Sequence, residues 1–238
     1  MKYKAVILAA GLGSRLGNLT EEVPKAMVKV DGHPIIDYQM NVLMSNNIND
    51  VIIIVGYKKD MLTNYVNKYW GDKINLRFVE NTKYATTNSA FSLNLSKEFI
   101  DSKSYIHMNC DTIFTSEMLS MLKNSRKVNQ IVVNKNIQLT DNMEQVRLND
   151  RNKITYMNNV FDKDAVGKAM GLAKISQGAL NWITKRIEYY HRNELFDSNF
   201  YGIIRECISN ITFYSLVARI NSIVEVNNQI ELETADKL

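Results

Sequence analysis

The first thirty residues combine two glycines, an arginine and a lysine at a spacing suited to binding a polyphosphate. An apolar run at 6–10 predicts a buried strand, and Gly11-Leu12-Gly13-Ser14-Arg15 follows it directly. Glycines allow a sharp turn and a close approach of the backbone to a ligand. Arg15 and Lys25 add positive charge beside this turn. Backbone N–H groups and cations can therefore converge on an anion.

Two familiar phosphate-binding loops do not account for this segment. A dinucleotide-binding loop requires a third glycine three residues after Gly13, and a Walker-type loop requires Gly-Lys-Ser/Thr five residues after its first glycine. Position 16 is leucine, so both patterns fail. The remaining pattern is Gly-x-Gly-x-Arg followed by Pro24-Lys25. An ordinary strand-to-helix turn with a chance arginine and lysine is the alternative.

A carboxylate is expected at the end of a second buried strand. Residues 104–109 predict this strand, and Cys110-Asp111 follows it. Ligands of open parallel sheets lie beyond the carboxyl ends of the strands. A carboxylate at such a place can bind Mg²⁺, which bridges triphosphate oxygens and offsets charge in the transition state. Alternatively, Asp111 caps the next turn.

The glycine loop and the lysine together resemble the nucleotidyltransferases that activate sugar phosphates and phosphocholine. The matching segments are Leu8–Leu16 and Val23–Met27. The resemblance implies that Lys25 contacts the phosphates at the reacting centre and that Arg15 contacts the leaving pyrophosphate. It also places a further set of residues at the nucleotide: Leu8, Ala9, Ala10, Gly11, Gly13, Ser14 and Asn109.

The same resemblance implies two ligands for Mg²⁺. Asp111 matches the first, and Asn227, in Val224-Glu225-Val226-Asn227-Asn228, occupies the position of the second. The family usually has an aspartate there, whereas Val-Asn-Asn is similar to the uridylyltransferases of the same fold. An amide oxygen is a weaker Mg²⁺ ligand than a carboxylate, although an acceptable one. An asparagine in a turn is the alternative.

The segment at 84–89 is expected to contact the base of the nucleotide. It resembles the corresponding segment of phosphocholine cytidylyltransferase-like proteins, so Tyr84, Thr87, Asn88 and Ser89 are expected at the nucleotide. An asparagine side chain offers an acceptor and donors suited to the amino group and ring edge of cytosine. Thr87 or Asn88 could also cap a helix. This segment favours CTP over other nucleotides.

Three residues are candidates for contacts with the acceptor. Lys135 follows a predicted strand at 130–133 and either binds the acceptor phosphate or is solvated. Lys168 stands where sugar-type relatives have a glutamate, which argues against a cationic acceptor and suits one carrying a carboxylate. Tyr201 and nearby aromatic residues could supply part of a choline cage or could belong to the core.

The resemblance implies a Mg²⁺-dependent cytidylyltransferase. It would transfer CMP from CTP to an acceptor of the L-glutamine phosphate or phosphocholine type, release pyrophosphate and give a CDP-linked product for surface polysaccharide decoration. Two alternatives stay open. One is a sugar-1-phosphate nucleotidyltransferase that makes an NDP-sugar. The other is a nucleotide-binding regulatory subunit without catalysis, for which Asn227 in place of aspartate is the one argument.

Strands alternate with helices through the first half, which predicts an α/β fold with a Rossmann-like, mostly parallel sheet and crossover helices. The expected strands are 4–10, 50–55, 75–80 and 104–109, and the expected helices are 35–46, 60–69 and 88–97. Beyond them we expect a strand at 130–133, a hairpin of 144–148 with 153–157, a strand at 170–175, helices at 177–193 and 199–209, and a last strand at 221–226.

This organisation predicts one nucleotidyltransferase domain over residues 1–238. Residues 1–130 would form the nucleotide-binding part, and 131–238 the acceptor-binding part with the second metal ligand. The later residues would form a small lid or acceptor subregion on the same sheet. The oligomeric state is left open by the sequence.

The composition and charge of the chain indicate which binding partners and which cellular location to expect. The chain has 238 residues, of which 45% are hydrophobic and 23% charged, as in ordinary globular proteins. The net charge of +4 is spread along the chain and is too weak to argue for nucleic acid. We expect a cytoplasmic protein with no membrane partner. The two cysteines are far apart, the first segment is unlike a signal peptide, and the apolar run is too short to span a membrane. The three histidines lack metal-ligand spacing and are expected to be structural or on the surface.

Overall fold

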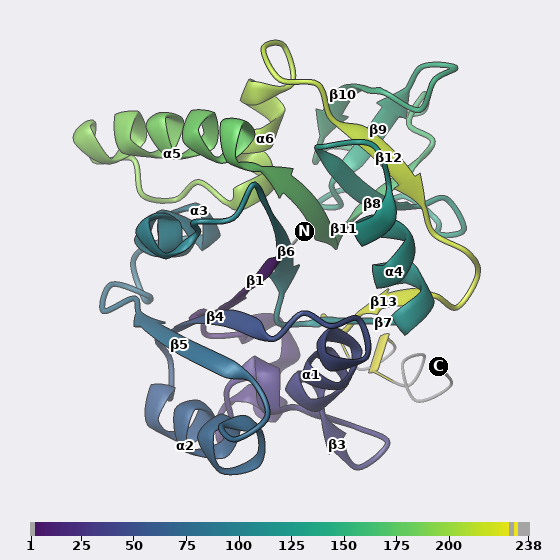
Figure 1. Cartoon of the computed structure of the whole chain (residues 1–238). Coiled ribbons are helices and arrows are strands. Elements are labelled where there is room, and N and C mark those ends of the chain that lie inside the picture. Colours follow the sequence, from purple (N-terminus) through teal and green to yellow (C-terminus); the bar gives the residue numbers. More distant parts are fainter. Residues whose placement is uncertain (1–2, 229–230, 233–238) are drawn as a thin grey trace.

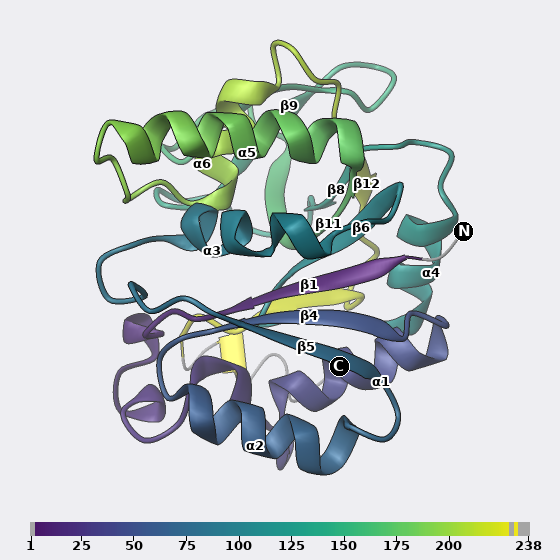
Figure 2. The ribbon, with the colours of Figure 1, turned by 60° about the vertical axis from the view of Figure 1, so that its left-hand side comes forward.

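A mixed β-sheet with helices on both faces organises the molecule (Figure 1). The computed structural model describes residues 3–228, 231 and 232. The strand order is β10-β9-β11-β6-β1-β4-β5, with β8 paired to β11 and β12 paired to β8. Helices α3, α5 and α6 cover one face, and α1, α2 and α4 cover the other (Figure 2). None of the helices in these residues is long and apolar enough to cross a membrane.

The first half contains the predicted parallel strands and their crossover helices. β1 pairs in parallel with β4 and β6, and β4 pairs in parallel with β5. The strands are β1 (Lys4–Ala9), β4 (Asp50–Val55), β5 (Asn75–Glu80) and β6 (Ser104–Asn109). The helices are α1 (Ile35–Ser45), α2 (Lys59–Trp70) and α3 (Ser89–Ser96). Every residue of β4 is buried, as expected for a parallel strand covered on both faces.

The second half adds antiparallel strands around β11 (Gly167–Ser176), which pairs with β6, β8 and β9. The predicted hairpin is confirmed as the antiparallel pair of β9 and β10. This half of the chain also contains β8 (Gln130–Asn134), β9 (Gln145–Leu148), β10 (Ile154–Asn158), α5 (Gln177–Arg192) and α6 (Phe200–Cys207). The central sheet therefore begins as a parallel sheet and continues with mostly antiparallel pairs, the exception being the parallel pair of β8 and β12.

The sequence patterns did not predict several short elements. These are β2 (Lys29–Val30), β3 (His33–Pro34), β7 (Thr112–Phe114), α4 (Ser116–Asn124), β12 (Tyr214–Val217) and the 3-10 helices η1 (Ser14–Thr20), η2 (Lys25–Met27) and η3 (Lys97–Phe99). Most are too short to carry a periodic pattern. The last predicted strand is present as β13 (Ile223–Glu225), which pairs antiparallel with β7 outside the main sheet.

His107 on β6 is fully buried behind the helical layer formed by α6. Its ring stacks on Phe200, with 3.7 Å between centroids and 14° between the planes. Both ring nitrogens are buried without a hydrogen-bond partner among the described residues. Burial therefore lowers the pKa of His107 to about 3, because the charged form would lose its hydration. This histidine is structural, as expected from the sequence.

His107 should make the protein less stable in mild acid. The folded pKa lies below the unfolded value of about 6.5, so the stability it contributes is present above that pH and is lost as the pH falls. Between pH 7 and 5 the free energy of unfolding should fall by about 2 kcal/mol more in the wild type than in His107→Leu. Urea titrations at both pH values measure the difference, and parallel pH dependences would contradict it.

Candidate active site

A cavity of about 640 Å³ opens at the carboxyl ends of β1 and β6. The predicted nucleotide contacts line it, with the exception of Ala9, and so do Asp111 and Asn227. Side chains alternate along a strand, and Ala9 belongs to the opposite core with Ala5 and Ile7. The expectation that Ala9 lines the nucleotide site is therefore not met in the structure.

The glycine loop has the backbone geometry that its sequence predicts. Gly13 has a φ of 71°, in the left-handed region that glycine adopts freely. A Cβ at this position would lie 3.0 Å from Cγ2 of Thr20 and 3.2 Å from Cβ of Lys25. Thr20 closes the loop, because its hydroxyl donates to the Gly13 carbonyl at 3.1 Å. Arg15 is exposed on this loop and forms no ion pair within the described chain, so its charge is available to an anion.

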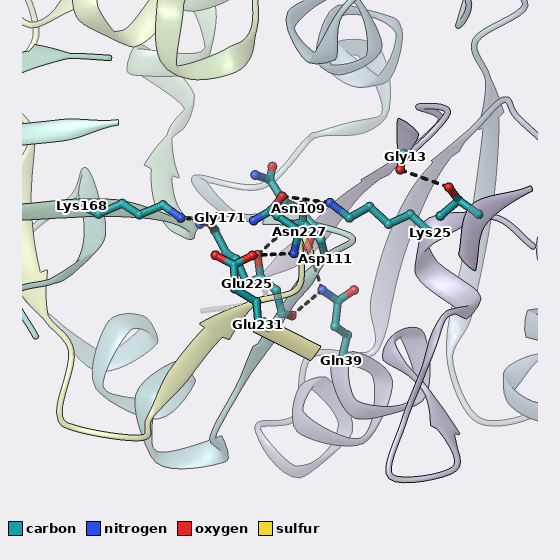
Figure 3. A network of polar contacts seen from close by, with 12 residues as sticks. Gly13, Lys25, Gln39, Asn109, Asp111, Lys168, Gly171, Glu225, Asn227 and Glu231 are labelled. Atoms are coloured by element: carbon teal, nitrogen blue, oxygen red, sulfur yellow. Dashed lines mark hydrogen bonds and ion pairs between the residues drawn. The ribbon is translucent and has the colours of Figure 1, made fainter. Parts of the chain in front are cut away.

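Lys25 joins the two predicted metal ligands (Figure 3). Its Nζ donates to Oδ2 of Asp111 at 2.6 Å and to Oδ1 of Asn227 at 3.0 Å. The side chains of Lys25 and Asp111 are only 9% and 13% exposed. Burial alone would raise the pKa of the Asp111 carboxyl, but Lys25, supported by Arg15 and Lys168, holds it below its usual value. Asp111 is therefore ionised at neutral pH.

These contacts indicate that the site can hold a divalent cation. The Lys25 ammonium occupies the place of a cation between a carboxylate oxygen and an amide oxygen, the hard ligands that Mg²⁺ prefers. In residues 3–228, 231 and 232, no group of three or more His, Cys, Asp or Glu side chains is arranged to hold a metal. A Mg²⁺ at Asp111 and Asn227 would thus need further oxygen ligands from a triphosphate and from water.

Strand pairing brings these distant residues together. Glu225 of β13 lies opposite Thr112 of β7, and the N–H of Val226 donates to the Asp111 carbonyl at 2.8 Å. Asn227 then follows directly beside Asp111. The short strand β7, which the sequence did not predict, is the element that makes this contact possible.

Gln39 of α1 stabilises the same turn by two hydrogen bonds to its backbone. Its Nε2 donates to the carbonyls of Asn109 and Thr112, each at 2.8 Å, and its side chain is buried. These two carbonyls flank Asp111, so Gln39 fixes the backbone that carries the carboxylate. Sequence reasoning missed this residue. The available signal was a polar side chain on the apolar face of the predicted helix, between Ile36 and Leu43.

The segment at 84–89 has the capping role that the sequence allowed, and it also lines the cavity. Asn88 caps α3, since its Oδ1 accepts from the N–H of Ser89 at 2.7 Å. Thr87 donates its hydroxyl to the Lys83 carbonyl at 2.8 Å. Ser89 accepts the N–H of Phe200 at 2.9 Å, which joins this segment to the N-terminus of α6. Its contact with the nucleotide base stays a prediction.

The predicted acceptor residues differ in their surroundings. Lys168 lines the cavity, but its Nζ is 2.6 Å from Oε2 of Glu225, and both side chains are buried. The sequence argument treated Lys168 as a free cation that would repel a cationic acceptor, and this pairing removes that premise. Tyr201 also lines the cavity and donates its hydroxyl to the Met170 carbonyl. Lys135 is exposed beyond β8 and does not line the cavity, so its contact with an acceptor phosphate stays a prediction.

Gln39→Leu should loosen the Asp111 turn. The two carbonyls would lose a buried donor, which costs about 1–3 kcal/mol of folding free energy. If the turn positions Asp111, kcat should also fall by more than tenfold while the KM for nucleotide changes less. Urea denaturation and steady-state kinetics measure the two effects. Asn41→Ala, on the exposed side of the same helix, is the control; equal kinetics in both variants would contradict the role of Gln39.

Gly171→Ala should destabilise the cavity wall. A Cβ there would lie 2.4 Å from Oγ1 of Thr112 and 2.7 Å from Cβ of Asn109, so β11 must move away from the Asp111 turn. Overpacking of this kind costs about 1–3 kcal/mol. The matched control is Gly178→Ala in α5, where the nearest atom lies 4.0 Å away and no loss is expected. Thermal unfolding compares the two, and equal midpoints would disprove the steric constraint.

Comparisons with known proteins give relatives of this chain in sequence and in structure. The family model for nucleotidyl transferases matches residues 4–145. A choline-phosphate cytidylyltransferase from Streptococcus pneumoniae is 46% identical over 112 residues, which cover 44% of this chain and 47% of that protein. A CTP:phosphoglutamine cytidylyltransferase from Campylobacter jejuni is 36% identical over 136 residues, which cover 55% and 52%. The chain thus spans about half the length of these curated relatives.

The three-dimensional comparison extends over the whole chain. The solved structure of the CTP:phosphocholine cytidylyltransferase from Streptococcus pneumoniae superposes with a TM-score of 0.83 at 27% sequence identity, covering 100% of this chain and 99% of that one. The sequence match covers more than half of the chain and includes the glycine loop, Lys25 and Asp111. This chain therefore belongs to the nucleotidyl transferase family.

Proposed function

We propose that this protein is a cytidylyltransferase that transfers CMP from CTP to a phosphorylated small molecule of the L-glutamine phosphate or phosphocholine type. The contact of Lys25 with both Asp111 and Asn227, beside the glycine loop and within one cavity, carries the proposal. The choice of CTP is supported by the cavity-lining segment at 84–89 and by the relatives named as cytidylyltransferases. The CDP-linked product would serve the decoration of a surface polysaccharide.

The proposed reaction is an in-line displacement at the α-phosphorus of CTP. An oxygen of the acceptor phosphate forms a bond to this phosphorus, and the bond to the oxygen shared with the β-phosphate breaks. Pyrophosphate leaves with that oxygen and its electron pair. A phosphate dianion is already a nucleophile, so no general base is required.

The protein residues would act by position and charge. The loop N–H groups and Arg15 would bind the β- and γ-phosphates, which become pyrophosphate. Lys25 would exchange its contact with Asp111 for phosphate oxygens and stabilise the charge that builds at the reacting centre. Asp111 and Asn227 would hold a Mg²⁺, which when bound would offset the negative charge of the phosphates. Residues 1–130 would bind the nucleotide, while 131–238 would supply the acceptor site and Asn227.

Lys25→Ala and Asp111→Ala should each lower kcat/KM with CTP by at least 100-fold, about 2.7 kcal/mol of transition-state stabilisation. Pyrophosphate release measures this loss, and circular dichroism checks that each variant is folded. Lys29→Ala, an exposed lysine on β2, is the matched control and should keep wild-type activity.

The nucleotide and acceptor panels separate the competing functions. CTP should exceed UTP, dTTP and GTP with phosphocholine, L-glutamine phosphate or a related acceptor. Preference for UTP and a sugar 1-phosphate would instead identify an NDP-sugar synthase. Tight CTP binding without turnover on any acceptor would identify a regulatory nucleotide-binding protein, and full activity of either alanine variant would refute the assigned roles.

A further inference from the structure

One end of the cavity, the Glu144 end, is lined by Glu144, just before β9, and by Phe200 and Tyr201 of α6. Lys168 of β11 and Glu225 of β13 also line the cavity. Glu225 is fully engaged, because Lys168 lies 2.6 Å from Oε2 and the N–H of Gly171 donates to Oε1 at 2.6 Å. Each carboxylate oxygen of Glu225 therefore already has a donor within the protein, and Lys168 is paired with it.

Glu144 is only partly satisfied by the protein. Its Oε1 accepts one hydrogen bond from Nη2 of Arg205 at 3.1 Å, so the pair is not bidentate. Its Oε2 is buried and has no hydrogen bond of standard geometry in the described part of the chain, although the Asn199 side chain lies near the carboxylate and lowers its pKa. The side chain is 13% exposed. Arg205 also donates to Oδ1 of Asn159 at 3.1 Å, so its charge is shared between two acceptors.

A buried carboxylate oxygen without a donor is costly, and a ligand that supplies one is favoured. Burial raises the pKa of Glu144, outweighing the opposing effects of Arg205 and Asn199, so the protein alone does not fully stabilise the charge. A primary ammonium group provides both a positive charge and N–H donors. Asn142, Asn159 and Asn199 also line the cavity. The side-chain oxygens of Asn159 and Asn199 already accept from Arg205 and Gly202, but each oxygen has a second lone pair for an ammonium N–H.

A quaternary ammonium group finds a poorer environment here. Such a group has no N–H and is bound by the open faces of aromatic rings. The aromatic residues at this end are Phe200 and Tyr201, which are 2% and 6% exposed. One face of Phe200 is covered by His107, and the Tyr201 hydroxyl is engaged by the Met170 carbonyl. The described lining is thus rich in amides and poor in open aromatic faces.

We propose, on the basis of the proposed function, that Glu144 recognises a primary ammonium group on the acceptor. The acceptor class is then a phosphate or phosphonate that also carries a primary amine, such as an aminoalkyl phosphate or an amino-acid phosphate. Its phosphate lies at the Lys25 end of the cavity, and its nitrogen lies at the Glu144 end. Trimethylated and uncharged acceptors bind less well.

Stepwise N-methylation of one acceptor tests this directly. Phosphoethanolamine, its N-methyl and N,N-dimethyl forms, and phosphocholine keep the phosphate and the positive charge but lose N–H donors. With CTP, kcat/KM should fall along the series, by at least tenfold in total, and L-glutamine phosphate should behave as a primary-amine acceptor. Equal or better use of phosphocholine, or of glycerol phosphate, would overturn the proposal.

A variant tests the assigned residue. Glu144→Gln keeps the shape and one oxygen but removes the charge, so the KM for phosphoethanolamine should rise at least tenfold while the KM for CTP stays unchanged. The preference within the methylation series should shrink as well. Glu98→Gln, an exposed glutamate on η3, is the matched control. If Glu144→Gln does not fold, the methylation series decides by itself.

Failure of the proposed function can be told apart from failure of this inference. If no acceptor is turned over with CTP, the transferase assignment fails. Saturation-transfer NMR on the CTP-loaded protein then compares binding of phosphoethanolamine and phosphocholine. At least tenfold tighter binding of the primary amine, lost in Glu144→Gln, would support the recognition role. Equal binding of the two compounds would overturn it.

Discussion

The buried contact between Lys25 and Asp111 is the interaction on which the site depends. Removing two charges from water is costly, and a short contact with further hydrogen bonds is needed to offset that cost. The 2.6 Å distance and the added bond to Asn227 provide both. Each partner belongs to a different segment: Lys25 to η2, Asp111 to the turn after β6, and Asn227 to the chain after β13. The contact therefore fixes three segments around one point.

The same contact fits the proposed function. Asp111 and Asn227 hold a positive charge between two oxygens. In the proposed reaction the Lys25 ammonium would pass from the carboxylate to phosphate oxygens without leaving the site, so little reorganisation would accompany the reaction. Gln39 donates to the carbonyls of Asn109 and Thr112, and these two hydrogen bonds hold the Asp111 turn in place beside Lys25.

Local patterns predicted the strands β1, β4 and β6. β1 and β4 are apolar runs after their first residue, and the middle of β6, Tyr105–Met108, is buried. They also predicted the glycine loop, since Gly13 requires a left-handed backbone. The pairing of β7 with β13 was beyond their reach, because strands of three residues carry no periodic signal. The ion pair of Lys168 with Glu225 was beyond them for a related reason: it joins residues far apart in the chain, and the sequence around Lys168 contains no sign of its partner.

In the proposed reaction, an acceptor phosphate attacks the α-phosphorus of CTP beside Lys25. Phosphorus NMR with an oxygen-18-labelled phosphoethanolamine or L-glutamine phosphate follows the oxygen that forms the new bond. We expect a CDP-linked product in which one labelled oxygen bridges the two phosphorus atoms, together with unlabelled pyrophosphate, and no product with Lys25→Ala. Label in the pyrophosphate, or conversion of CTP to CMP or CDP without a linked product, would contradict it.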